Sequence, residues 1–176
     1  MRQSINSKWI ALIVVAVFLL FWLIGWYWSF APATYDVNKR VAQQTSVANP
    51  ANIAGYTLTS TMIEVSETLL DKPGGYLSND VIPPGVFLDN MPSFEFGVLE
   101  MIRDLALSMR KDFSRSQSQS IENPYLTKAH PKFNMDHRSW MFPSSESSYR
   151  DGITLLKQYR DALADPQNGD SQFYTR

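Results

Sequence analysis

Cysteine is absent from this chain of 176 residues. The protein therefore has no disulfide bond, no thiolate ligand for a metal and no cysteine nucleophile. Histidine is scarce, with two residues, and basic and acidic side chains nearly balance at a formal net charge of −1. Neither half of the chain concentrates the positive charge that binding to a phosphate backbone requires. We therefore expect no nucleic-acid partner.

Charge is also absent from the longest apolar stretch, Trp9–Phe30. About 22 residues of helix span roughly 33 Å, enough for a hydrocarbon core of about 30 Å. Aromatic residues typical of a membrane–water interface end the stretch: Trp22, Trp26, Tyr27 and Trp28. Ala31-Pro32-Ala33 resembles a signal-peptide cleavage site, but the run exceeds the about 7–15 apolar residues of such peptides. We favour a retained transmembrane anchor over a cleaved signal or a buried core helix.

The basic residues that flank this stretch set its predicted orientation. Arg2 and Lys8 precede it, Lys39 and Arg40 follow it, and the α-amine breaks the tie. The positive-inside rule then favours a cytoplasmic N-terminus, which in a Gram-negative bacterium predicts a single-pass inner-membrane protein with a periplasmic C-terminal domain. The expected parts are a cytoplasmic N-terminus (1–8), a transmembrane helix (9–30), a juxtamembrane linker (31–56), a helical extracytoplasmic domain (57–166) and a polar tail (167–176).

Three further stretches carry apolar residues at helical spacing, and none has a convincing strand pattern. They predict helices over Thr57–Lys72, Ser93–Phe113 and Ser144 or Ser145 to about Ala164. Ser93 is expected to cap the second helix, while Thr61 and Glu64 have the spacing of a capping box in the first. Glu64 is also expected on a solvated acidic face. The predicted fold class is all-α, with a transmembrane helix followed by a small helical domain with long apolar loops.

Two loops between these helices are unusually apolar, over Tyr76–Pro92 and Pro124–Pro143. Pro83-Pro84-Gly85 excludes a regular helix in the first. Such apolar residues either pack across the helices or present a surface to lipid or to a partner. The candidates for partner binding are Val86, Phe87, Leu88, Trp140, Met141 and Phe142.

The second loop also holds the residues best suited to metal chemistry: His130, Asp136 and His137. Two imidazoles and a carboxylate can bind zinc or another divalent metal, although their spacing matches no established ligand signature. Alternatively, these side chains hydrogen-bond the loop's own backbone. A serine hydrolase using Ser144 or Ser145 is disfavoured, because the chain has no G-x-S-x-G turn. We expect no cofactor.

Two long runs resemble a known family: GGYLSNDVIPPGVFLDNMPSFEFGVLEMIRDLALSMRKDFSRSQSQS and KAHPKFNMDHRSWMFPSSESSYRDGI. They are similar to the DUF2333 family, a group of uncharacterised, membrane-anchored proteobacterial proteins. The resemblance covers the anchor and nearly all of residues 55–176. It implies no activity, cofactor or catalytic residue. It also implies a longer protein of which this chain is the N-terminal part, so the last helix is expected to lack packing partners.

These observations favour a non-enzymatic interaction or scaffold module that binds another envelope protein through its apolar loops. The alternative is a metal-dependent periplasmic enzyme that uses His130, Asp136 and His137. Self-association through the anchor is a third possibility, and Gly25 alone gives it little support.

Overall fold

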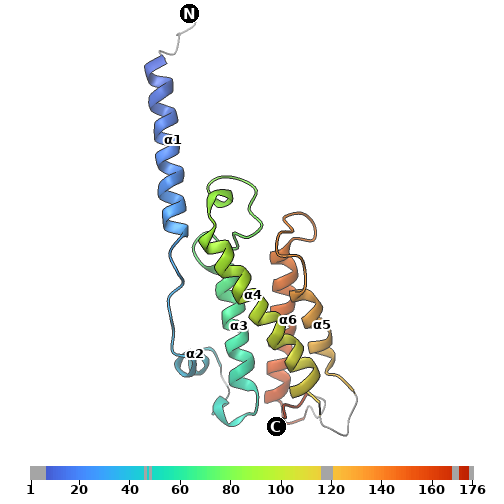
Figure 1. The fold of residues 1–176 in the computed structure, drawn as a ribbon. Coiled ribbons are helices and arrows are strands. Elements are labelled where there is room, and N and C mark those ends of the chain that lie inside the picture. The colour runs from blue at the N-terminus through green and yellow to red at the C-terminus, as the bar shows by residue number, and fades with distance from the viewer. Residues whose placement is uncertain (1–6, 46, 48, 116–120, 168–170, 175–176) are drawn as a thin grey trace, which may run out of the picture.

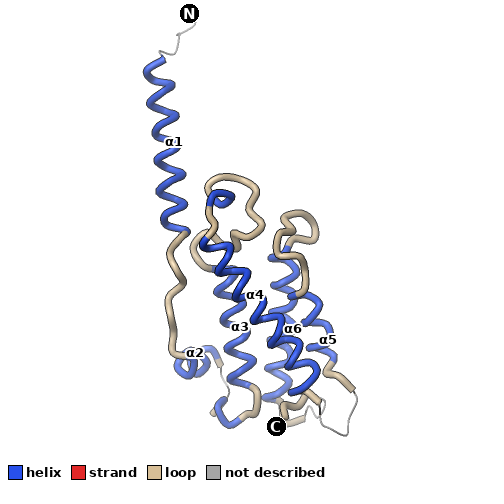
Figure 2. Tube along the Cα trace, viewed as in Figure 1, coloured by secondary structure: helices blue, strands red, loops and turns tan. Residues whose placement is uncertain are grey.

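The computed structural model describes residues 7–45, 47, 49–115, 121–167 and 171–174. These residues form helices and no strand, which confirms the all-α prediction (Figures 1 and 2). The described α-helices are α1 (Ser7–Trp28), α2 (Val37–Gln44), α3 (Tyr56–Asp71), α4 (Asn90–Ser108), α5 (Pro124–Phe133) and α6 (Ser145–Ala164). Shorter helical turns are η1 (Pro50–Asn52), η2 (Gly85–Phe87) and the π-helical η3 (Met109–Phe113). Of the predicted N-terminus and tail, residues 1–6, 168–170 and 175–176 lie outside the described residues.

α1 projects away from the other helices and is almost wholly exposed, with Gly25 as its buried residue (Figure 1). Its 22 residues include a window with a mean hydropathy of 2.6. The helix is long and apolar enough to cross a membrane, although a signal sequence near an N-terminus meets the same test. It begins and ends two residues earlier than the predicted stretch Trp9–Phe30.

The helices α3, α4, α5 and α6 form a bundle around one hydrophobic core (Figure 1). Its most deeply buried side chains include Leu99, Met109, Phe133, Leu156 and Tyr159. The most extensive contacts in the bundle join α6 to α5 and to α3. The last helix was expected to lack packing partners, and that expectation is wrong for this bundle.

Helix α5 lies where the sequence predicted only loop. Asn123 caps it, because its Oδ1 accepts hydrogen bonds from the backbone N–H groups of Tyr125 (3.0 Å) and Leu126 (3.3 Å). Pro124 follows at the first helical position, where its missing N–H costs nothing. Leu126, Ala129 and Phe133 then bury one face. The predicted loop Pro124–Pro143 is therefore half helix, and only residues 134–144 connect α5 to α6.

The predicted N-terminal caps of two helices are also wrong, and that of a third is right. α4 begins at Asn90, so Ser93 lies inside it instead of capping it. α3 begins at Tyr56 behind Gly55, which has a φ of +79° that a glycine adopts without steric cost. Ser144 does cap α6, since its hydroxyl accepts a bond of 3.3 Å from the N–H of Ser147.

Glu64 is buried instead of lying on a solvated face. Its Oε1 lies 2.7 Å from the Nε atom of Arg40 on α2. Asp36 caps α2 by accepting a hydrogen bond of 2.9 Å from the backbone N–H of Lys39. The ion pair between Arg40 and Glu64 therefore joins α2 to the side of α3.

Candidate functional site at the loop end of the bundle

Both apolar loops lie at the same end of the bundle, and the first loop lies beside the C-terminal end of α1 (Figures 1 and 2). The first loop (residues 72–89) joins α3 to α4, and the second loop (residues 134–144) joins α5 to α6. Asn79 links them, because its Nδ2 donates to the carbonyl of Ser139 (2.9 Å) and to the carboxylate of Glu146 (2.8 Å). We call this the loop end, and the opposite end of the bundle the far end.

The first loop is folded around the carboxylate of Glu95, a side chain that is 0% exposed. Its oxygens accept hydrogen bonds from the N–H groups of Leu77 (2.9 Å) and Ser78 (2.7 Å) and from the Ser78 hydroxyl (2.5 Å). The buried ammonium of Lys72 pairs with the same carboxylate and donates to the carbonyl of Gly75. The carboxylate of Glu95 on α4 therefore fixes the backbone of the first loop at Leu77 and Ser78.

Glu95 was not among the site residues predicted from the sequence, although a signal was present. Glu95 lies on the same helical face as Leu99, Ile102 and Ala106, all of which are buried. A carboxylate in such a stripe must be paired or hydrogen-bonded, because burying an isolated charge is very costly. Its register with the apolar stripe could have marked it as an organiser of the neighbouring loop.

The first loop also packs directly against α1. A Cβ atom on Gly25 would lie 3.5 Å from the Cβ of Pro84 and 3.7 Å from the Cδ2 of Leu88. Nearer the end of α1, the Trp28 ring covers Gly74, where a Cβ would come within 2.7 Å of the ring. The close approach depends on glycine at position 74, whereas a Cβ at position 25 would make ordinary van der Waals contacts.

An apolar groove of about 710 Å³ separates the first loop from α1 elsewhere. One wall is α1 from Phe18 to Trp26 together with Ser29 just after the helix, and the other is the first loop from Pro83 to Leu88. We call it the α1 groove. The hydroxyl of Ser29 donates to the Gly25 carbonyl at 2.8 Å, so the helix itself satisfies this polar group.

Large apolar side chains cover the outer surface of the loop end. In the first loop Phe87 is 77% exposed and Ile82 is 68% exposed. Exposed side chains also include Val81, Val86, Trp140, Met141 and Phe142. Leu88 differs, because it is half-buried beside Gly25. Apolar surface gathered in this way is typical of sites that meet lipid or another protein, and partner binding by these residues stays a prediction.

Neutral hydrogen bonds close the second loop around Ser145, which is fully buried. Its hydroxyl lies 2.6 Å from the carbonyl oxygen of Asp136 and 2.9 Å from that of Ser139, and its N–H donates to Ser139 at 2.9 Å. The Ser139 hydroxyl donates to the carbonyl of Pro143 at 3.0 Å. Because the Ser145 hydroxyl is buried and already bonds to backbone carbonyls, it is not available as a nucleophile.

The two histidines lie on different elements and contact different partners. His130 on α5 has Nδ1 3.2 Å from Arg110 Nη1 and Nε2 3.1 Å from Asn134 Nδ2. Burial, with a smaller contribution from Arg110, lowers the pKa of His130. His137 lies in the second loop, with its ring 4.7 Å from that of Phe96. Burial, followed by the nearby Arg138, lowers the pKa of His137.

Asp136 lies beside only one of these histidines, with its Oδ1 3.6 Å from His137 Nδ1. No group of three or more His, Cys, Asp or Glu side chains within the described residues is arranged to hold a metal ion. The metal site of His130, Asp136 and His137 stays a prediction that this geometry does not favour.

A family model described as "Uncharacterized protein conserved in bacteria (DUF2333)" matches residues 2–176. The chain belongs to the DUF2333 family. No curated protein and no solved structure matches it. The family resemblance seen in the sequence is thus confirmed, and it assigns no activity to the loop end.

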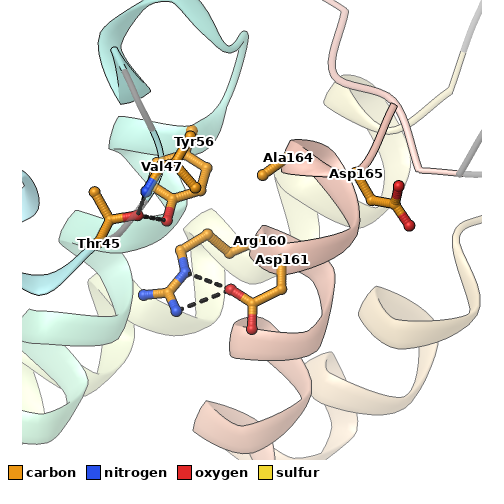
Figure 3. A pocket seen from close by; sticks show the side chains of 7 residues that line it. All are labelled: Thr45, Val47, Tyr56, Arg160, Asp161, Ala164 and Asp165. Atoms are coloured by element: carbon orange, nitrogen blue, oxygen red, sulfur yellow. Dashed lines mark hydrogen bonds and ion pairs between the residues drawn. The ribbon is translucent and has the colours of Figure 1, made fainter. Parts of the chain in front are cut away.

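The far end of this DUF2333 protein carries a polar pocket of about 410 Å³ (Figure 3). The Arg160 guanidinium lies at its centre, 5.6 Å from the centroid of the Tyr56 ring. Its Nε and Nη2 atoms bond to Asp161 Oδ1 at 3.1 and 2.9 Å. The Tyr56 hydroxyl is 2.7 Å from the Thr45 hydroxyl. Because the cation already has a carboxylate partner, the loop end is the stronger candidate site.

Proposed function

We propose that this chain is a single-pass inner-membrane protein whose helical bundle is seated on the periplasmic surface of the bilayer by its loop end. It would act there as a non-enzymatic scaffold or interaction module of the bacterial envelope. One observation carries the proposal: both loops with exposed apolar side chains lie at one end of the bundle, and at this end the first loop contacts α1, the helix that is apolar enough to cross a membrane. Surface at this end would meet lipid before it met a protein from the periplasm.

The position of the first loop along α1 supports this seating. The α1 groove runs from Phe18 to Ser29, and the eleven steps between these residues rise about 16 Å at the spacing of a helix. The hydrocarbon core of a bilayer is about 30 Å thick. If α1 crosses the membrane, the part of the first loop between Pro83 and Leu88 therefore lies at the depth of one leaflet.

The backbone of that part suits an environment without water. Pro83 and Pro84 have no N–H group to satisfy. The N–H groups of Val86, Phe87 and Leu88 donate to carbonyls four or three residues earlier, at 3.2, 3.0 and 2.9 Å. Unsatisfied backbone groups cost several kcal/mol in hydrocarbon, so a turn that bonds to itself is favoured there. The side chains from residue 81 to residue 88 also carry no charge.

The absence of native cysteine allows a direct test with single-cysteine variants of the full chain in nanodiscs. Phe87→Cys, Phe142→Cys and Ile121→Cys would each carry a nitroxide spin label. Ile121 is the matched control, because it is an exposed apolar residue (83%) that lies between α4 and α5, at the far end. We expect the label at residue 87 to be deepest in lipid, the one at 142 shallower, and the one at 121 in water.

Equal access of a water-soluble nickel chelate to all three labels would contradict the seating. Protection of residues 87 and 142 only when other envelope proteins are added would instead indicate a protein partner. The orientation has its own test in intact spheroplasts. A membrane-impermeant maleimide is expected to label Ile121→Cys from outside, and labelling only after lysis would contradict a periplasmic bundle.

A further inference from the structure

The α1 groove is shaped and lined for a flexible apolar ligand. Its volume of about 710 Å³ lies within the roughly 300–1,000 Å³ of typical small-molecule sites. Phe18 and Trp22 form part of its helix wall, and Phe87 faces them from the first loop. The Ser29 hydroxyl is already bonded to the Gly25 carbonyl, so it offers no unpaired polar group to a ligand.

We infer that the α1 groove binds one acyl chain of a bilayer phospholipid. The inference rests on the proposed function, because it requires α1 to cross the membrane. The length of the groove supports it: about 16 Å along α1 is close to half of a hydrocarbon core of about 30 Å, which is the depth of a single leaflet. An acyl chain that enters beside Trp26 would run along the helix towards Phe18.

A second transmembrane helix fits this groove less well. Helices approach one another in membranes where small residues recur four positions apart, as Gly25 and Ser29 do, so the expectation that Gly25 stands alone is wrong. Pro84 and Leu88 already occupy the space at Gly25, however, at 3.5 and 3.7 Å from the position of a Cβ. The remaining wall of α1 is aromatic, which keeps another backbone at a distance but leaves room for methylene groups.

The test uses the full chain in nanodiscs of phosphatidylethanolamine and phosphatidylglycerol. A small fraction of the lipid would carry a diazirine in its acyl chain, and mass spectrometry would map the adducts after irradiation. We expect the adducts to concentrate on the groove walls, around Trp22 and Phe87. Leu20 is the internal reference, because it is 54% exposed on α1 but does not line the groove.

Trp22→Ala removes a wall of the groove, and Trp9→Ala is its matched control outside the groove. Adducts on the first loop are expected to fall several-fold in Trp22→Ala and to stay at the wild-type level in Trp9→Ala. Wild-type adducts spread evenly over Leu20 and the groove would overturn the inference, since lipid would then only surround the helix. Cross-links to a second copy of the chain in place of lipid would overturn it as well.

The depth measurement separates the two proposals. A label at residue 87 that stays in water would contradict the seating of the loop end itself. A deep label together with evenly spread adducts would leave the seating intact and contradict only the acyl-chain site.

Discussion

The two apolar loops resemble each other in composition, but their backbones are held in different ways. The first loop surrounds the buried carboxylate of Glu95, which pairs with the buried ammonium of Lys72. The second is closed by neutral bonds around the hydroxyl of Ser145, and at its start the guanidinium of Arg103 on α4 donates to the carbonyl of Met135 at 2.8 Å. Charge-assisted hydrogen bonds are roughly twice as strong as neutral ones. The first loop has the more deeply buried charged attachment, because the side chains of Lys72 and Glu95 are 1% and 0% exposed whereas that of Arg103 is 18% exposed.

The way the first loop is held helps to explain why its large apolar side chains stay exposed. In water, burial of apolar surface is favourable, so an unconstrained loop would turn Ile82 and Phe87 towards the bundle. The bonds that Leu77 and Ser78 donate to Glu95 fix the start of the first loop, and the contact of Pro84 and Leu88 with α1 at Gly25 fixes its later part. Both attachments restrict such a movement.

Glu95→Gln should have the largest effect of the substitutions that test this comparison. It leaves the Lys72 ammonium buried without a counter-charge, and breaking one partner of a buried pair costs about 3–5 kcal/mol. We expect a loss of that order in the free energy of unfolding of the full chain. Guanidinium denaturation in detergent, followed by helical circular dichroism, would measure it.

Glu100→Gln is the matched control on the same helix. Glu100 is half exposed and pairs with Arg103 at 2.5 Å, three residues later. Exposed pairs are worth about 0–1 kcal/mol, so a small change is expected. Similar losses in the two variants would contradict the special role of Glu95. In Glu95→Gln a spin label at residue 87 is also expected to gain more mobility than one at residue 142.

Ser145→Ala tests the neutral attachment of the second loop and should cost less. It removes a buried hydroxyl from the carbonyls of Asp136 and Ser139, and a typical neutral hydrogen bond contributes about 0.5–1.5 kcal/mol. We expect a destabilisation of that order, measured by the same denaturation. Ser147→Ala, at an exposed position of the same helix, is the control. A loss as large as that of Glu95→Gln would contradict the ranking of the two attachments.

Much of the helical architecture could be predicted because it depends on local spacing. Leu99 and Ile102 on α4, and Leu156 and Tyr159 on α6, follow the helical period and are buried. The absence of charge marked α1 in the same way. The caps of the helices were less predictable: Gly55 precedes α3 through its backbone conformation, which the capping pattern of side chains does not reveal.

The location of the second loop could not be predicted because α5 was missed. With three helices after the anchor, a connection between α4 and the last helix would lie at the far end. α5 reverses the chain once more and returns residues 134–144 to the end beside α1 (Figure 2). The Asn123-Pro124 start of α5 was visible in the sequence, but Pro131 inside the helix obscured its continuation. Because this helix was not predicted, the sequence did not indicate that both apolar loops lie at the same end of the bundle.

The smallest expected effect concerns Asp80, a partly buried acid of the first loop. Burial raises its pKa, and the neighbouring carboxylates of Glu95 and Glu146 raise it further, against the opposing Lys72 ammonium. The folded protein therefore holds the Asp80 proton more tightly than the unfolded chain does. Below the unfolded value of 3.8 the neutral acid costs nothing, and stability is lost as pH rises through the raised folded pKa.

Asp80→Asn removes that ionisation while keeping the shape of the side chain. The variant should melt slightly above the wild type at pH 7, and the gain should disappear once the pH falls below 3.8. Asp89→Asn, an exposed acid at the other end of the same loop, should give no such gain. A gain for Asp80→Asn that persists unchanged at pH 3, or a loss at pH 7, would mean that the Asp80 carboxylate makes a favourable contact in the first loop. In that case two carboxylates, those of Asp80 and Glu95, would stabilise the first loop. Glu95 would then not be the single acidic residue that organises it.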